Sequence, residues 1–138
     1  MKKIIISIII SLAFLTVFSA PRFTADWYKE NSQSYLDKIA TLYVYKAIPT
    51  NSSSGYEGYV SFLCYTMYKG EEGGIALVLV KYGKDTTYFE QNFGVKQKSK
   101  NKKRTTRILR AKMIGVEPSS SNGFMFMKPS CKFIAEFN

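Results

Sequence analysis

The sequence predicts an α+β fold that is mainly antiparallel β-sheet, with five to six strands and a short helix near the N-terminus. Segments rich in β-branched and aromatic residues alternate with turns rich in glycine, proline and serine, which is typical of strands joined by short connections. Long helices do not alternate with these segments, which disfavours a parallel α/β fold. The 138 residues, of which 46% are hydrophobic, suffice for one packed domain.

The N-terminus has the three parts of a secretory signal peptide. Two lysines precede an apolar run over residues 4–18, and a small residue follows at Ser19 or Ala20. Pro21 disfavours cleavage directly after Ala20, so we expect cleavage after Ser19 and one mature domain over residues 20–138. The apolar run is shorter than the roughly 20 residues that cross a bilayer, which disfavours a retained membrane anchor. The predicted location is therefore secreted or periplasmic.

The first elements of the mature chain are a short helix and three strands. Residues 24–39 combine apolar residues at near-helical spacing with Asp26 as a candidate N-cap, which predicts a short helix or turn. Residues 41–48 predict a strand. Residues 59–68 and 75–82 predict a β-hairpin around the glycine-rich stretch that joins them. The second strand of this hairpin is apolar at both alternations, so we expect it at the centre of the sheet.

The later segments complete the predicted sheet. Residues 86–93 place Thr87, Phe89 and Phe93 on one side, as a half-buried strand would. Residues 105–116 predict a strand with apolar residues on both alternations, so the sequence does not decide which set of side chains faces the core. The last predicted strands are residues 124–127 and 131–137. The same strands could instead close into a small all-β, OB-like barrel, which is the alternative fold class.

The chain has two cysteines, Cys64 and Cys131, and both lie in predicted strands. Because two cysteines in an oxidising compartment pair by default, the sequence predicts a disulfide that joins these strands. The chain contains no histidine, which excludes Ser-His-Asp and Cys-His catalytic systems. Two cysteines also cannot complete a four-ligand zinc site. We therefore expect a non-enzymatic protein without a metal or a cofactor.

The most distinctive local feature is a basic patch over residues 96–112, with nine cations and no acid. Like charges in one run repel each other and do not pack, so we expect the first half of the patch to be an exposed loop. The patch predicts docking on an anionic surface, a polyanion or an acidic protein partner, with a merely solvated loop as the plain alternative. Its members are Lys96, Lys98, Lys100, Lys102, Lys103, Arg104, Arg107, Arg110 and Lys112.

Two other functions stay open as alternatives. Tyrosines on a sheet could stack on sugar rings, as in a glycan-binding, toxin-like or adhesin-like subunit of a secreted homo-oligomer. Paired carboxylates could hydrolyse a glycosidic bond without histidine, and Glu90 is the one acid inside a predicted aromatic strand. The tyrosines concerned are Tyr43, Tyr45, Tyr59, Tyr65, Tyr68, Tyr82 and Tyr88.

A signal peptide, a short helix, an antiparallel barrel and one disulfide together give a layout similar to that of the B subunits of bacterial AB5 toxins. The long helix that those subunits place before their last strands has no clear counterpart in this sequence. The resemblance concerns architecture and implies nothing about the ligand.

Overall fold

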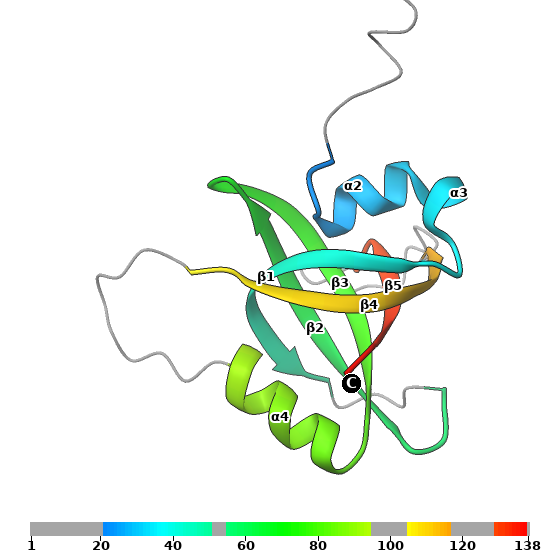
Figure 1. Cartoon of the computed structure of the whole chain (residues 1–138), viewed down its shortest axis with the longest axis vertical. Helices are drawn as coiled ribbons and strands as arrows, with labels where there is room; N and C mark the ends of the chain where they lie inside the picture. The colour runs from blue at the N-terminus through cyan, green and yellow to red at the C-terminus, as the bar shows by residue number, and fades with distance from the viewer. Residues whose placement is uncertain (1–20, 51–54, 95–104, 117–128, 138) are drawn as a thin grey trace, which may run out of the picture.

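Five strands close into a barrel in the computed structural model, which describes residues 21–50, 55–94, 105–116 and 129–137. The order around the barrel is β1-β2-β3-β5-β4, and β4 pairs with β1 to close it (Figure 1). Neighbouring strands are antiparallel except β3 and β5, which are parallel. This architecture agrees better with the small all-β barrel than with the α+β fold predicted first. The strands are β1 Ile39–Pro49, β2 Tyr59–Tyr68, β3 Glu71–Lys81, β4 Arg107–Val116 and β5 Cys131–Ala135.

Alternating residues of each strand point into the barrel and fill it. In β4 the buried side chains are Leu109, Ala111 and Met113, so the inward face that the sequence left open is the odd-numbered one. β3 lies between β2 and β5, and Leu79 on its outer alternation is buried together with the inward-facing Val78. The predicted burial on both alternations is therefore confirmed over this part of β3, but a closed barrel has no central strand.

The two halves of β1 pair with different strands. Residues 39–44 pair with β4, and residues 44–49 pair with β2, with a register shift between Val44 and Lys46. Such an irregularity bends a strand and increases its twist, which lets one strand turn from one neighbour to the next. The bend in β1 therefore helps the sheet to close into a barrel.

The predicted hairpin of β2 and β3 is confirmed, but its turn is tighter than the glycine-rich stretch suggests. The turn consists of Lys69 and Gly70, which both have positive φ angles, of 50° and 83°. β3 then begins at Glu71, so Gly73 and Gly74 belong to the strand. These two glycines have a packing role that is described with the cleft below.

Helices close the two ends of the barrel (Figure 1). Helix α2, Ala25–Glu30, and the short α3, Ser32–Tyr35, lie at one end, and α4, Lys84–Phe93, lies at the other. The short N-terminal helix is thus confirmed. Its N-cap is Thr24, whose hydroxyl accepts a hydrogen bond from the Trp27 amide at 3.4 Å, and not Asp26 as predicted. Asp26 lies in the first helical turn, where its charge interacts favourably with the helix dipole.

Helix α4 occupies the segment predicted as a strand over residues 86–93, so that prediction is wrong. The helix follows Gly83, whose carbonyl accepts from the Thr86 hydroxyl at 2.8 Å and whose amide donates to the same hydroxyl at 3.0 Å. Thr86 and Phe89 are buried on the helix face that meets the barrel, and Phe93 follows on the same face. Phe89 and Phe93 are four residues apart, a spacing that fits a helix and an alternating strand equally well.

The predicted disulfide is also wrong, because both cysteines are buried free thiols. Cys64 in β2 is paired with Ala76 in β3, and Ala76 is paired on its other side with Cys131 in β5. The two cysteines are therefore two strands apart, about 9–10 Å at ordinary strand spacing. A disulfide needs Cα atoms within about 7 Å, so the barrel keeps these cysteines beyond bonding reach.

Several predictions fall on residues outside the described ranges. They concern the signal peptide over residues 1–19, the strand over residues 124–127, and the members of the basic patch before residue 105. Within the described ranges, no helix is both long enough and apolar enough to cross a membrane.

Candidate functional site

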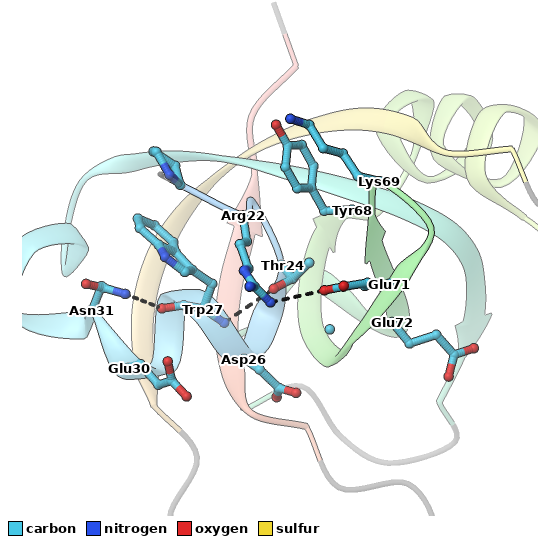
Figure 2. Close-up of a pocket in the computed structure, with 12 residues that line it drawn as sticks. Arg22, Thr24, Asp26, Trp27, Glu30, Asn31, Tyr68, Lys69, Glu71 and Glu72 are labelled. Atoms are coloured by element: carbon cyan, nitrogen blue, oxygen red, sulfur yellow. Dashed lines mark hydrogen bonds and ion pairs between the residues drawn. The ribbon is translucent and has the colours of Figure 1, made fainter. Parts of the chain in front are cut away.

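A cleft of about 810 Å³ lies at the α2 end of the barrel, between the N-terminal segment, α2 and the β2–β3 hairpin (Figure 2). Residues from two distant parts of the sequence meet in it, so no local sequence pattern predicts this cleft. The lining residues are Pro21, Arg22, Thr24, Asp26, Trp27, Glu30, Asn31, Tyr68, Lys69, Glu71, Glu72 and Gly73.

Helix α2 forms one wall of the cleft, and a buried hydroxyl fastens it to the barrel. Thr66 Oγ1 in β2 accepts a hydrogen bond from the Ala25 amide at 3.0 Å. The same hydroxyl can donate to the carbonyl oxygens of Gly73 and Gly74, at 3.0 and 2.9 Å. One side chain therefore connects α2, β2 and β3 at a single point.

Gly73 and Gly74 let the start of α2 lie directly on β3. A Cβ atom at Gly73 would collide with the side chain of Thr24, and one at Gly74 would collide with the carboxylate of Asp26. Gly74 also has a φ of 83°, which other residues rarely adopt. Gly73 therefore permits the close approach of the residue that caps α2, and the Asp26 carboxylate lies directly against Gly74.

Further contacts fix α2 from its buried side. The Tyr28 hydroxyl donates to the Thr41 carbonyl at 2.8 Å and accepts from the Thr41 amide at 3.1 Å. Burial raises the pKa of Tyr28 to about 12. The Cys131 thiol donates to the Ala25 carbonyl at 3.2 Å, and burial raises the pKa of this thiol to about 12. Both groups are thus neutral hydrogen-bonding partners at physiological pH.

Two aromatic side chains stand among the polar groups of the cleft. Trp27 is half-buried and contacts Tyr35, with ring centroids 5.3 Å apart. Tyr68 packs edge-on against Tyr43 at 5.1 Å, and the Lys69 ammonium lies 5.3 Å from the Tyr68 ring centroid. Figure 2 shows Trp27 and Tyr68 on opposite sides of Arg22. The cleft therefore offers ring faces together with hydrogen-bonding groups.

The charges of the cleft are mixed, with an excess of carboxylates. Arg22 forms an ion pair with Glu71 at 3.1 Å, and Glu72 accepts a hydrogen bond from the Tyr45 hydroxyl at 3.1 Å. Asp26 accepts a hydrogen bond from Ser130, and Glu30 is exposed on the outer side of α2. Within the described ranges, no group of three carboxylates or cysteines is arranged to hold a metal ion.

The structure gives the hydrolase alternative little support. The four acids of the cleft, Asp26, Glu30, Glu71 and Glu72, are all exposed to water. A general-acid carboxyl in a glycosidase needs a desolvated environment that keeps it protonated. Glu90, expected inside a strand, is an exposed residue of α4.

The described members of the basic patch are Arg107, Arg110 and Lys112, all in β4. Arg110 and Lys112 point away from the barrel, next to Thr41 and Ile39 of β1. Arg107 is exposed at the start of the strand, on the opposite alternation. The salt bridge between Arg22 and Glu71 is the only one among the described residues, so the three β4 cations have no acidic partner there.

The tyrosines singled out in the sequence do not form a single face. Tyr43, Tyr45 and Tyr65 lie half-buried on the outer side of β1 and β2, where the Lys46 ammonium is 5.0 Å from the Tyr65 ring centroid. Tyr68 contributes to the cleft. The others lie elsewhere: Tyr59 begins β2, Tyr82 follows β3, and Tyr88 is on α4.

No family model matches the sequence, and neither a curated protein nor a solved structure gives a match. What the two regions could bind follows from their own chemistry. The cleft combines Trp27 and Tyr68 with carboxylates, and β4 presents cations without an acidic partner among the described residues.

Proposed function

We propose that this protein is an exported, non-enzymatic binding protein whose basic patch docks on an anionic surface or an acidic partner. The observation that carries the proposal is that Arg107 and Arg110 are exposed and Lys112 is half-buried on one strand, without an ion pair to an acid in the described part of the chain. Cations that stabilise a fold are normally paired or solvated singly. A run of nine without an acid is better explained by a ligand of opposite charge.

The barrel supports this function by holding the cations on a rigid strand. β4 is hydrogen-bonded to β1 on one side and to β5 on the other, so its backbone is satisfied and its outer side chains are free for a ligand. Arg110 and Lys112 are two residues apart, so their Cα atoms are about 7 Å apart on the same face. That separation allows both side chains to contact neighbouring anionic groups. Arginine can also bind phosphate or sulfate oxygens with two parallel hydrogen bonds.

The test is retention on immobilised heparin, lipopolysaccharide or nucleic acid at two salt concentrations. Replacing Arg110 and Lys112 with Ser should weaken retention and reduce its salt dependence, because fewer counterions are released. Replacing Lys102, Lys103 and Arg104 with Ser should do the same. The control for the Arg110 and Lys112 variant replaces Lys81 and Lys84, which flank the turn before α4, and removes the same two charges. Equal losses in control and test variants, or no loss in either test variant, would overturn the proposal.

A second candidate function is recognition of a glycan in the cleft. Sugar rings stack on aromatic faces, and carboxylates and amides bind their hydroxyl groups, which suits Trp27, Tyr68 and the polar groups between them. The strand order supports an OB-like barrel, a fold with members that bind oligosaccharides, although a fold alone does not establish a function.

Trp27 is the only tryptophan of the chain, so its fluorescence reports on the cleft directly. A glycan that binds there should change the Trp27 emission in a saturable way. Tyr68→Ala should abolish this change, whereas Tyr82→Ala, outside the cleft, should leave it unaffected. A protein that sediments strictly as a monomer and retains nothing on a glycan array would exclude this alternative.

A further inference from the structure

We propose that the anionic partner is a lipid bilayer surface, which the protein contacts with the outer face of β1 and β4; this inference rests on the function proposed above. The observation behind it is that exposed aliphatic side chains stand among the cations of this face. We call it the β1–β4 face and define it by the outward residues of the two paired segments: Ile39, Thr41, Tyr43, Ile108, Arg110 and Lys112.

The register of the two strands mixes apolar and basic residues on this face. Ile39 is paired with Lys112, and Thr41 with Arg110. The opposite alternation points inward, since Ala40 and Ala111 are buried. Ile108 and Ile39 remain 59% and 45% exposed, which is a large share for isoleucines in a folded domain. The face therefore alternates between residues that suit hydrocarbon and residues that suit anionic headgroups.

A soluble polyanion explains the cations but not the isoleucines. Heparin and nucleic-acid backbones contact Arg and Lys, and they offer no apolar environment for Ile39 and Ile108. A bilayer surface satisfies both kinds of side chain at once. Aliphatic groups enter the boundary between headgroups and acyl chains, while the cations above them contact lipid phosphates. The cations and the isoleucines of the β1–β4 face therefore both favour an anionic bilayer surface as the partner.

Two acids lie near this face, and neither is bonded to its cations. Asp37 donates its amide to the Met113 carbonyl at 2.8 Å, and Glu136 donates its amide to the Arg110 carbonyl at 2.9 Å. Asp37 therefore lies at the β1 edge of β4, and Glu136 lies across from Arg110 at the β5 edge. Among the described residues neither acid forms an ion pair with Arg110 or Lys112. Both cations therefore remain available for anionic headgroups that come within about a Debye length.

The experiment is cosedimentation of the full chain with two kinds of vesicle: phosphatidylcholine alone, and phosphatidylcholine with phosphatidylglycerol. We expect binding to the anionic vesicles only. The double variant Ile39→Ser, Ile108→Ser should lose roughly tenfold in vesicle affinity, because less apolar area enters the interface, and should keep its retention on heparin. Arg110→Ser, Lys112→Ser should lose both. Tyr82→Ser removes an apolar side chain that is 77% exposed elsewhere, and it should change neither.

The outcomes separate this inference from the proposed function. If the isoleucine variant binds anionic vesicles as well as the unchanged protein does, the lipid inference is wrong and the anion-binding function stands. The same holds if the unchanged protein binds heparin but no vesicle, or binds both vesicles equally. If the arginine–lysine variant retains both activities, the proposed function itself fails. Because all four substituted side chains are outward-facing, thermal unfolding should be nearly unchanged and confirms that each variant is folded.

Discussion

The two ends of the barrel differ in how much side-chain hydrogen bonds add to ring packing. At the α4 end, Phe89 packs against Phe62 and Phe93, with ring centroids 4.6 and 5.0 Å apart. At the α2 end, the buried Tyr28 ring also packs against neighbouring aromatic rings, and the hydroxyls of Thr66 and Tyr28 add hydrogen bonds that fix the helix. Ring packing is spread over many atoms, whereas a hydrogen bond depends on one donor and one acceptor. Loss of a single hydroxyl should therefore loosen α2, whereas α4 should respond mainly to loss of a ring.

The largest effect is expected from Phe89→Ala at the α4 end. The ring is fully buried, so its loss leaves a cavity and should lower the free energy of unfolding by about 3–5 kcal/mol. Tyr88→Ala is the control, because this neighbouring ring is exposed on the same helix. Urea unfolding of both variants measures the difference. Similar small losses for the two would show that aromatic packing does not close this end.

The next largest effect is expected from Gly74→Ala at the α2 end. Gly70 and Gly74 both have a φ of 83°, but a Cβ at Gly70 meets nothing within 4 Å, while one at Gly74 meets Asp26. Gly70→Ala should cost about 1–2 kcal/mol of backbone strain. Gly74→Ala should cost more, because the Asp26 carboxylate must rotate away and lose its hydrogen bond with Ser130. Urea unfolding of both variants measures the difference, and equal losses would refute a role for the contact between Gly74 and Asp26.

A smaller effect is expected from Thr66→Val, which removes the shared hydroxyl and leaves its shape. The Ala25 amide then stays buried without an acceptor, and stability should fall by about 1–3 kcal/mol. Hydrogen exchange should accelerate at α2 before it accelerates in the strands, because α2 opens locally. Thr87→Val, at an exposed site on α4, is the matched control. Uniform acceleration across the whole barrel would contradict a local opening.

The effect of alkaline pH is small near pH 9 and grows with each further pH unit. Burial raises the pKa values of Tyr28 and Cys131 to about 12, and that of Cys64 is raised as well. The folded state keeps these protons where the unfolded state loses them, so stability is constant below about pH 8 and falls from about pH 9 to 12. Each group contributes at most about 1.4 kcal/mol per pH unit. Urea midpoints at several pH values measure the slope, and Tyr28→Phe should make it shallower above pH 10.

The strands could largely be predicted from the sequence, but their closure could not. Local composition indicated β2 and β3 and the hairpin between them, because a short turn leaves few choices of partner. The pairings of β1 with β4 and of β3 with β5 join segments that are distant in sequence, and no local pattern encodes them. The disulfide prediction failed for the same reason. Residue types made it reasonable, and only the position of Ala76 between the cysteines excludes it.

The basic patch stays a prediction as a binding site. The charge run indicated it, and its last members lie on β4, with Arg107 and Arg110 exposed and Lys112 half-buried. The cleft could not be found, because Trp27 and Tyr68 come from separate elements and neither belongs to a motif. Asp26 was singled out as a helix cap, and the structure instead places its carboxylate against Gly74. The glycine pair Gly73 and Gly74 was the one sequence signal that another element could approach β3 closely.

The position of β5 has a consequence for how the chain acquires its structure during translation. Residues 131–135 are made after the other four strands, yet they lie between β3 and β4 and supply Phe133 to the interior. A nascent chain that lacks them can form the β1–β2–β3 meander, but β3 and β4 have no neighbour along one edge. The barrel therefore cannot close until residues 131–135 have left the ribosome. Before that point the nascent chain exposes unpaired strand edges, to which other proteins can bind.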